Sequence, residues 1–198
     1  MANNTTKEKI RQQAISLFKE NGYENVTVLQ ICKAAGITKR TFYYHFSSKD
    51  EIIHGILGHV AQQIELMSEA MLHQESHVGI IWAMMRGYAV EAEETGAGII
   101  SQFYINILQR GATDKFPQDM MLFKAVVNNI ANAQLAGEIG NMQSPEDVAY
   151  ALYHTLRSVA YTWGSSGGND SLMDEYKHAF QSVLQILLPP DKAFGADA

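Results

Sequence analysis

Apolar residues recur at helical spacing along almost the whole chain, and no stretch shows the strict apolar–polar alternation of a half-buried strand. The pattern predicts a first helix over about residues 5–21. A capping box that starts at Thr27 opens a second, short helix, which Gly36 ends. Thr38 then caps a third helix, which reaches about His45.

The remaining two thirds of the chain predict longer and more apolar helices. A fourth helix starts at Ser48–Glu51, and its apolar stripe continues to Met71. Beyond residue 75 the helices are apolar around most of their circumference, as in the centre of a bundle. Five of them are expected, over about residues 78–92, 99–108, 117–138, 144–163 and 171–189. The sequence therefore predicts an all-α protein of about nine helices.

Composition limits the classes of protein that fit this pattern. Cys32 is the only cysteine, which excludes a disulfide framework and a cysteine-rich zinc site. A hydrophobic content of 46% is ordinary for a globular chain. We find neither a signal peptide nor an apolar run long enough for a membrane span, so we expect a cytoplasmic protein.

Charge is distributed unevenly along the chain. The net charge of −6 by itself argues against binding to nucleic acid. Residues 1–50, however, carry eight Lys or Arg against four Asp or Glu, a formal +4, which leaves −10 on the other 148 residues. This asymmetry predicts two parts with different tasks, of which the first is suited to DNA.

The second and third helices, joined by a tight turn at Gly36, have the organisation of a helix-turn-helix. Within the third helix, Phe42 and Phe46 are four residues apart and are expected to face the core. The faces left over carry an unusual density of hydrogen-bond donors for so short a helix. The residues that carry these donors are Lys39, Arg40, Thr41, Tyr43, Tyr44 and His45.

The segment from Gly36 to Ile52 resembles the signature of TetR-family transcriptional regulators, and the resemblance extends over roughly residues 7–57. It implies a helix-turn-helix DNA-binding domain over residues 1–52, a helical ligand-binding and dimerisation domain over residues 53–190, and a C-terminal tail over residues 191–198. It also implies a non-enzymatic homodimer, most simply a repressor that a small-molecule effector releases from a palindromic operator. Cys32 stands where the family usually has a small residue, and we interpret it as part of the core.

The resemblance also implies roles for single residues. Helix caps and exposed hydrogen-bond donors are expected to bind DNA phosphates. Lys39 and Arg40 are expected to contact guanines, and Thr41 a thymine methyl group. Tyr44 and His45 are expected to position the DNA backbone. The predicted DNA-binding residues are Thr27, Thr38, Lys39, Arg40, Thr41, Tyr43, Tyr44, His45 and Lys49; among them Thr27, Thr38, Tyr43 and Lys49 are the phosphate contacts.

Two further sets follow for the second domain. The pocket for an apolar or aromatic effector would be lined by Trp82, Met85, Tyr88, Phe103, Tyr104, Ile107, Met120, Phe123 and Val127. The same apolar stripes also fit an ordinary hydrophobic core. The last two long helices would pair with those of a second copy through Leu152, Leu156, Val159, Trp163, Tyr176, Phe180, Val183, Leu184 and Leu187.

Two alternatives remain open at this point. A TetR-like architectural DNA-binding protein would need no effector. A helical metal-dependent enzyme would use His73 and His77, which have the i, i+4 spacing of metal ligands with Glu75 between them. We favour an exposed loop for this segment, because it offers no third ligand, and we expect no metal and no cofactor.

Overall fold

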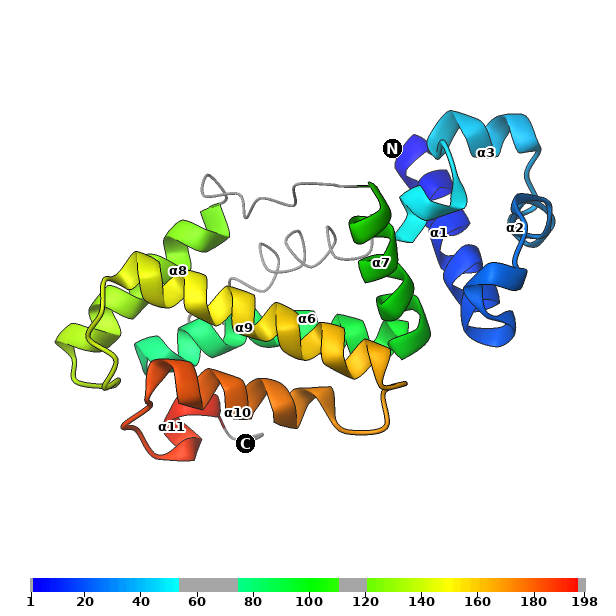
Figure 1. The fold of residues 1–198 in the computed structure, drawn as a ribbon. Coiled ribbons are helices and arrows are strands. Elements are labelled where there is room, and N and C mark those ends of the chain that lie inside the picture. Colours follow the sequence, from blue (N-terminus) through cyan, green and yellow to red (C-terminus); the bar gives the residue numbers. More distant parts are fainter. Residues whose placement is uncertain (1, 54–74, 111–120, 196–198) are drawn as a thin grey trace.

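The computed structural model describes residues 2–53, 75–110 and 121–195 (Figure 1). Their regular elements are helices, apart from one isolated bridge between Ile139 and Ile186, so the all-α prediction is confirmed. The elements, in chain order, are α1 (Ala2–Asn21), the 3₁₀ turn η1 (Tyr23–Asn25), α2 (Val28–Ala35), α3 (Lys39–His45), a helix from residue 49 described as far as residue 53, α6 (His77–Thr95), α7 (Ala97–Arg110), α8 (Met121–Leu135), α9 (Pro145–Ser165), α10 (Leu172–Leu184) and α11 (Pro190–Phe194).

The short helices begin and end where their cap residues predict. The Thr27 hydroxyl accepts a hydrogen bond from the Gln30 backbone N–H (3.3 Å), and the Gln30 side chain accepts one from the Thr27 backbone N–H (2.7 Å). Gly36 ends α2 with φ at 67°, a left-handed conformation that any Cβ would disfavour. Thr38 accepts a hydrogen bond from the Thr41 backbone N–H (3.1 Å) and so caps α3.

Two hydrophobic cores organise the described residues. The first is formed mainly by α1 to α3 and residues 52 and 53, and it also includes Ile99 and Phe103 of α7. The second lies among α6, α8, α9, α10 and α11. Figure 1 shows α7 between the two groups of helices, beside α1. One face of α7 therefore completes the core of the N-terminal helices, while Ile100 on the same helix packs into the second core.

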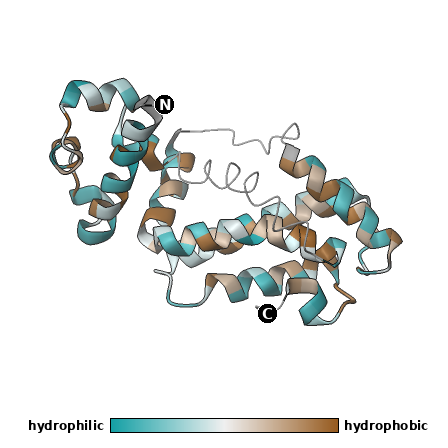
Figure 2. Ribbon diagram, turned by 180° about the vertical axis from the view of Figure 1, so that it is seen from behind, coloured by the Kyte–Doolittle hydropathy of each residue, from teal (hydrophilic) through white to brown (hydrophobic). Residues whose placement is uncertain are grey.

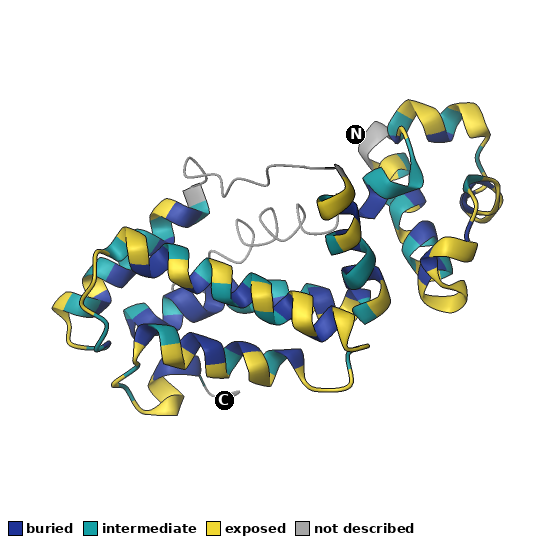
Figure 3. Ribbon diagram, in the orientation of Figure 1, coloured by how far each residue is buried: buried dark blue, intermediate teal, exposed yellow. Residues whose placement is uncertain are grey.

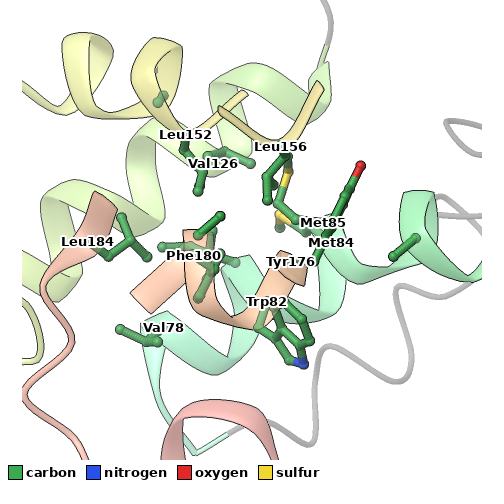
Figure 4. Close-up of a cluster of buried hydrophobic side chains, with 14 of the residues drawn as sticks. Val78, Trp82, Met84, Met85, Val126, Leu152, Leu156, Tyr176, Phe180 and Leu184 are labelled. Atoms are coloured by element: carbon green, nitrogen blue, oxygen red, sulfur yellow. The ribbon is translucent and has the colours of Figure 1, made fainter. Parts of the chain in front are cut away.

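Phe180 of α10 lies at the centre of the second core and is fully buried (Figure 4). The Trp82 ring packs edge-on against the Phe180 ring, at 5.2 Å between centroids, and against the Phe194 ring at 5.1 Å. Leu152 and Leu156 of α9 close the cluster from the other side. The apolar stripes of α6, α9 and α10 thus meet inside a single chain.

The C-terminus differs from its prediction. Helix α10 ends at Leu184, not near Pro189, and the non-glycine residue Gln185 adopts a left-handed φ of 54°. The following residues pair with the loop after α8, where the Leu187 N–H donates to the Glu138 carbonyl at 2.9 Å. Residues 190–194, most of them predicted as tail, instead form α11, because proline is favoured at the first position of a new helix. Phe194 of α11 is buried against Trp82.

Other boundaries lie outside the described residues. They include the apolar stripe of the fourth helix beyond residue 53 and the predicted helix start at Pro117. Helix α8 is described from Met121 and ends at Leu135, three residues before the expected Glu138.

Removal of the α9 cap tests the local part of this account. The Ser144 hydroxyl accepts a hydrogen bond from the Asp147 backbone N–H at 3.2 Å. We expect Ser144→Ala to lower the free energy of unfolding by about 1 kcal/mol, because one N–H at the helix start loses its partner. Urea denaturation followed by circular dichroism measures this loss. Ser158→Ala, at an exposed position within α9, should leave stability nearly unchanged, and an equal loss there would contradict the capping role.

Candidate DNA-binding surface

Helix α3 presents its cations to solvent because its aromatic residues face inward. Phe42 is fully buried and Phe46 is 3% exposed, and their ring centroids lie 5.9 Å apart. Lys39 and Arg40 are exposed at the start of the helix. Figure 2 shows that α3 as a whole is largely hydrophilic. Tyr43 is also exposed. Figure 3 shows that much of α3 is exposed. The rigid core thus fixes a short helix whose outer face is cationic and aromatic.

The remaining residues predicted on this surface are not equally available. Tyr44 is 73% exposed, and its ring lies edge-on to the half-buried His45 ring at 5.0 Å between centroids. Thr41 is half-buried, and its hydroxyl lies 3.0 Å from that of Thr38. The predicted contact of Thr41 with a thymine methyl group therefore involves a side chain that already serves the start of α3. Thr27 is exposed at the start of α2.

Lys49 is placed differently from its prediction. Its ammonium donates hydrogen bonds to the backbone carbonyls of Tyr23 (2.9 Å) and Val26 (3.2 Å). It also lies 4.0 Å from the centroid of the Tyr23 ring. The sequence predicted this ammonium on a DNA phosphate, whereas the structure turns it toward the chain's own backbone.

Cys32 belongs to the first core, as predicted. It is 3% exposed, and burial raises the pKa of its thiol while nearby Lys39 acts in the opposite direction. A raised pKa disfavours the reactive thiolate.

Six of the residues predicted to line an effector pocket belong to the second core or pack against it, and two belong to the first core alone. Trp82, Met85 and Phe123 are buried in the second core, which the Trp82 ring contacts fill. Phe103 and Ile107 pack instead with the N-terminal helices. Tyr88 and Val127 are half-buried at the edge of the second core, Tyr104 packs against both cores, and Met120 lies outside the described residues. Apolar periodicity located these side chains on their helices but could not tell which core each one enters.

A group of phenols and one guanidinium does converge between α6, α7, α9 and α10. The Tyr104 hydroxyl donates to the Arg157 carbonyl at 3.1 Å, and Arg157 Nη1 lies 3.4 Å from the Tyr153 hydroxyl. Burial raises the pKa of Tyr88 to about 12, and the neighbouring Tyr153 adds to the shift. Burial likewise raises the pKa of Tyr176, with further contributions from the phenols of Tyr104, Tyr88 and Tyr153.

We call these five residues, Tyr88, Tyr104, Tyr153, Arg157 and Tyr176, the phenol cluster. Figure 4 shows the Tyr176 ring extending past Met84 and Met85, with its hydroxyl away from Phe180. Sequence reasoning missed Tyr153 and Arg157 at this place and assigned Tyr176 to a dimer interface. The i, i+4 spacing of Tyr153 and Arg157 on α9 was the available signal.

The residues predicted at a dimer interface differ in how far a single chain buries them, and the interface itself stays a prediction. Tyr176 is 3% exposed, and the side chains between α9 and α10 are buried in the core of a single chain. Val159 and Val183 are half-buried, and Leu187 is exposed. The predicted residues that the structure buries are Leu152, Leu156, Trp163, Tyr176, Phe180 and Leu184. Helix α9 exposes His154 and Tyr161.

The metal-site alternative gains no support from the described residues. His77 lies at the start of α6, where its Nδ1 is 3.3 Å from the Asn129 side-chain oxygen. His73 lies outside the described residues. In residues 2–53, 75–110 and 121–195, no group of three or more His, Cys, Asp or Glu side chains is placed to hold a metal ion. Within the same ranges, none of the helices combines the length and the apolar character needed to cross a bilayer.

Comparisons with known proteins agree with the geometry of α1 to α3. Residues 10–56 match the family model described as bacterial regulatory proteins of the tetR family. The chain is 46% identical over 46 residues to the biofilm operon icaADBC HTH-type negative transcriptional regulator IcaR of Staphylococcus epidermidis, which is 23% of this chain and 25% of that protein. It is 31% identical over 122 residues to the HTH-type transcriptional regulator YvdT of Bacillus subtilis, covering 52% of this chain and 63% of that protein.

The match thus spans about a quarter of IcaR and less than two thirds of YvdT. Similarity of the fold extends over more of the chain than similarity of the sequence. The crystal structure of Thermus thermophilus FadR, a TetR-family repressor in complex with lauroyl-CoA, superposes with a TM-score of 0.61 over 92% of this chain and 95% of that chain. Sequence identity over that superposition is 18%, so it shows a shared fold.

Proposed function

We propose that the chain is a homodimeric TetR-family repressor that binds a palindromic DNA operator through α3; the match of residues 10–56 to the tetR-family model supports this proposal. The observation that carries the proposal is the orientation of α3. Its buried Phe42 leaves Lys39 and Arg40 free on the outer face.

This geometry suits the major groove of a duplex. A seven-residue helix is about 10 Å long and fits the groove. Arg40 and Lys39, at its exposed beginning, have the donors that read guanine O6 and N7. A two-fold axis would place a second α3 about 34–36 Å away, one turn of DNA further along. The exposed caps Thr27 and Thr38 lie at helix starts, where phosphates are favoured.

Selection of DNA by the protein tests this proposal without knowledge of the operator. The full chain is incubated with a random-sequence duplex library, and the recovered duplexes are sequenced and measured by fluorescence anisotropy at two salt concentrations. We expect a two-fold symmetric consensus, affinity that falls with salt, and a dimer in sedimentation. Recovery of no consensus, or binding by a monomer, would overturn it.

The phenol cluster supports a small-molecule effector. Hydroxyl and guanidinium donors surrounded by apolar side chains suit a ligand with an apolar body and an oxygen-bearing head. We propose that such a ligand binds better to a state whose two α3 helices no longer match successive grooves, and thereby releases DNA. Because the similar fold of FadR holds lauroyl-CoA, that compound is the first probe.

The effector proposal has its own measurement. We expect lauroyl-CoA to raise the melting temperature of the wild-type protein and to lower its affinity for the selected duplex, and Tyr176→Phe to weaken both effects. Ser182→Ala, which likewise removes one hydroxyl, at an exposed position of α10 where it donates to the His178 carbonyl, is the control. If lauroyl-CoA changes neither property, acyl-CoA control is excluded.

One observation favours a second function, an architectural DNA-binding protein without an effector. Trp82, Met85 and Phe123 fill the interior in which the sequence predicted a pocket. Mapping of the genomic binding sites distinguishes the two functions, because a repressor occupies a few symmetric operators and an architectural protein many scattered ones.

A further inference from the structure

Asn106 of α7 is a buried polar residue with an unpaired hydrogen-bond donor. Its side chain is 4% exposed. The Gln102 side-chain amide donates to Asn106 Oδ1 at 2.9 Å, which fixes the orientation of the Asn106 amide. Among the residues that the structure describes, none accepts a hydrogen bond from Asn106 Nδ2. The two N–H bonds of this nitrogen are therefore buried without an acceptor.

Such a donor is unusual, because most buried polar groups in proteins are paired and an unpaired one destabilises the fold. Within the described ranges, the other buried side-chain nitrogen without a partner is Arg11 Nη1. The two remaining guanidinium nitrogens of Arg11 donate to the Glu8 carboxylate, at 3.1 and 2.8 Å, so an ion pair holds that side chain. No charge compensates the Asn106 amide in this way, and its burial needs another explanation.

Asn106 lies on the face of α7 that is turned toward the N-terminal helices. Ile99 and Phe103 belong to the first core, and the helical repeat places Asn106 on the same face as these two residues. Tyr104 lies on roughly the opposite side of α7, where its hydroxyl donates to the Arg157 carbonyl. The Asn106 amide is thus separate from the phenol cluster.

The chemistry of the amide defines what can bind to it. A carboxamide N–H is an uncharged donor, and a carbonyl oxygen is its complement. Ile99 and Phe103 on the same face are apolar, so an ion placed here would lose its hydration and gain no opposite charge from them. The expected acceptor is therefore the oxygen of an uncharged and largely apolar molecule, such as a ketone, an ester or an amide.

We propose that Asn106 Nδ2 is the hydrogen-bond donor of a second small-molecule site, which takes the carbonyl oxygen of an uncharged, apolar compound where α7 meets the N-terminal helices. The ligand supplies the acceptor that the buried amide needs. Because Ile99 and Phe103 of the same helix belong to the core that supports α3, a ligand at Asn106 acts directly on the N-terminal helices. The inference goes beyond the proposed function, and its test uses no DNA.

Two probes that differ only in the acceptor test this inference. Acetophenone has a carbonyl oxygen, and α-methylstyrene replaces that oxygen with a CH₂ group of similar shape. Saturation-transfer difference NMR on the full chain gives a dissociation constant for each probe. The quantity compared is the ratio of the two constants, because α-methylstyrene is the more hydrophobic molecule. We expect Asn106→Leu to change this ratio about tenfold at the expense of acetophenone, the effect of one lost hydrogen bond.

Asn129→Leu is the matched control for the binding measurement. It makes the same chemical change on α8, where the amide is paired. Its nitrogen donates to the Ala125 carbonyl at 2.9 Å, and its oxygen lies 3.3 Å from His77 Nδ1. This variant should keep the wild-type ratio of the two dissociation constants.

Thermal unfolding without a probe distinguishes a binding role of Asn106 from a structural one. Asn106→Leu removes an unpaired buried donor, so we expect its melting temperature to rise by about 2–4 °C. Asn129→Leu removes a paired amide, and its melting temperature should not rise. A fall of the melting temperature in Asn106→Leu would show that the amide serves the fold, for example through a buried water, and would overturn the inference.

The binding data can overturn it independently. Acetophenone that fails to bind the wild-type protein at millimolar concentration, or a ratio of dissociation constants that Asn106→Leu leaves unchanged, removes the proposed site. Either result leaves the proposed binding of DNA by α3 intact. Conversely, a wild-type protein that selects no duplex leaves the site at Asn106 standing.

Discussion

Arg40→Ala is expected to weaken binding to the selected duplex by about 30-fold or more. One bidentate contact between arginine and guanine contributes about 1–3 kcal/mol to discrimination, and a symmetric dimer loses it twice. Arg40 is exposed and follows the first residue of α3, so its removal should leave the fold unchanged. Fluorescence anisotropy on the selected duplex and on a scrambled duplex measures the effect. The loss should be concentrated on the selected sequence, because nonspecific binding depends mainly on total charge.

The control for Arg40→Ala removes the same charge from the other part of the molecule. Lys124 is exposed on α8, in the second group of helices. Lys124→Ala should bind both duplexes as the wild-type protein does. An equal loss in the two variants would show that α3 does not read the sequence, and the proposed role of Arg40 would be abandoned.

Phe42→Ala is expected to lower the free energy of unfolding of the N-terminal helices by about 3–5 kcal/mol. The Phe42 side chain is fully buried and packs against Phe46 in the first core, so truncation leaves a cavity at the base of α3. Such a loss is a large fraction of the stability of an ordinary domain. Urea denaturation monitored by circular dichroism measures it, and DNA binding should fall together with stability.

The neighbouring Tyr43 provides the matched comparison. Tyr43 is 57% exposed, and its ring contacts that of Phe42 edge-on at 5.4 Å between centroids. We expect Tyr43→Ala to cost no more than about 1.5 kcal/mol of stability, the upper end of an aromatic pair. Its affinity for the duplex should nevertheless fall, since Tyr43 faces outward. If Phe42→Ala unfolded at the same urea concentration as the wild-type protein, the buttressing of α3 would be refuted.

Much of the fold was predictable because its signals are local. The ends of α2 and α3 follow from Thr27, Gly36 and Thr38, whose side chains or backbone conformation act within four residues. The inward direction of Phe42 and Phe46 follows from the helical repeat alone. The exposed cations of the candidate DNA-binding surface could therefore be named in advance.

The pocket and the dimer interface could not be predicted in the same way. An apolar stripe shows that one face of a helix is covered, but not by which neighbour. Leu156 and Phe180 were expected to meet a second copy, whereas they meet each other's helices and α6 in one chain. Phe103 was expected near a ligand and instead enters the first core. These assignments depend on how separate helices are arranged in space.

The sequence by itself determined the helical class, the caps of the short helices, the cationic character of the first fifty residues and the outward direction of Arg40. These properties depend on residues near one another in the chain. Only the tertiary structure decided that Lys49 binds the backbone of Tyr23 and Val26 and that phenols from four helices converge. Such contacts join residues far apart in sequence, and the competition of burial, charge and geometry between them is settled only when the chain is packed.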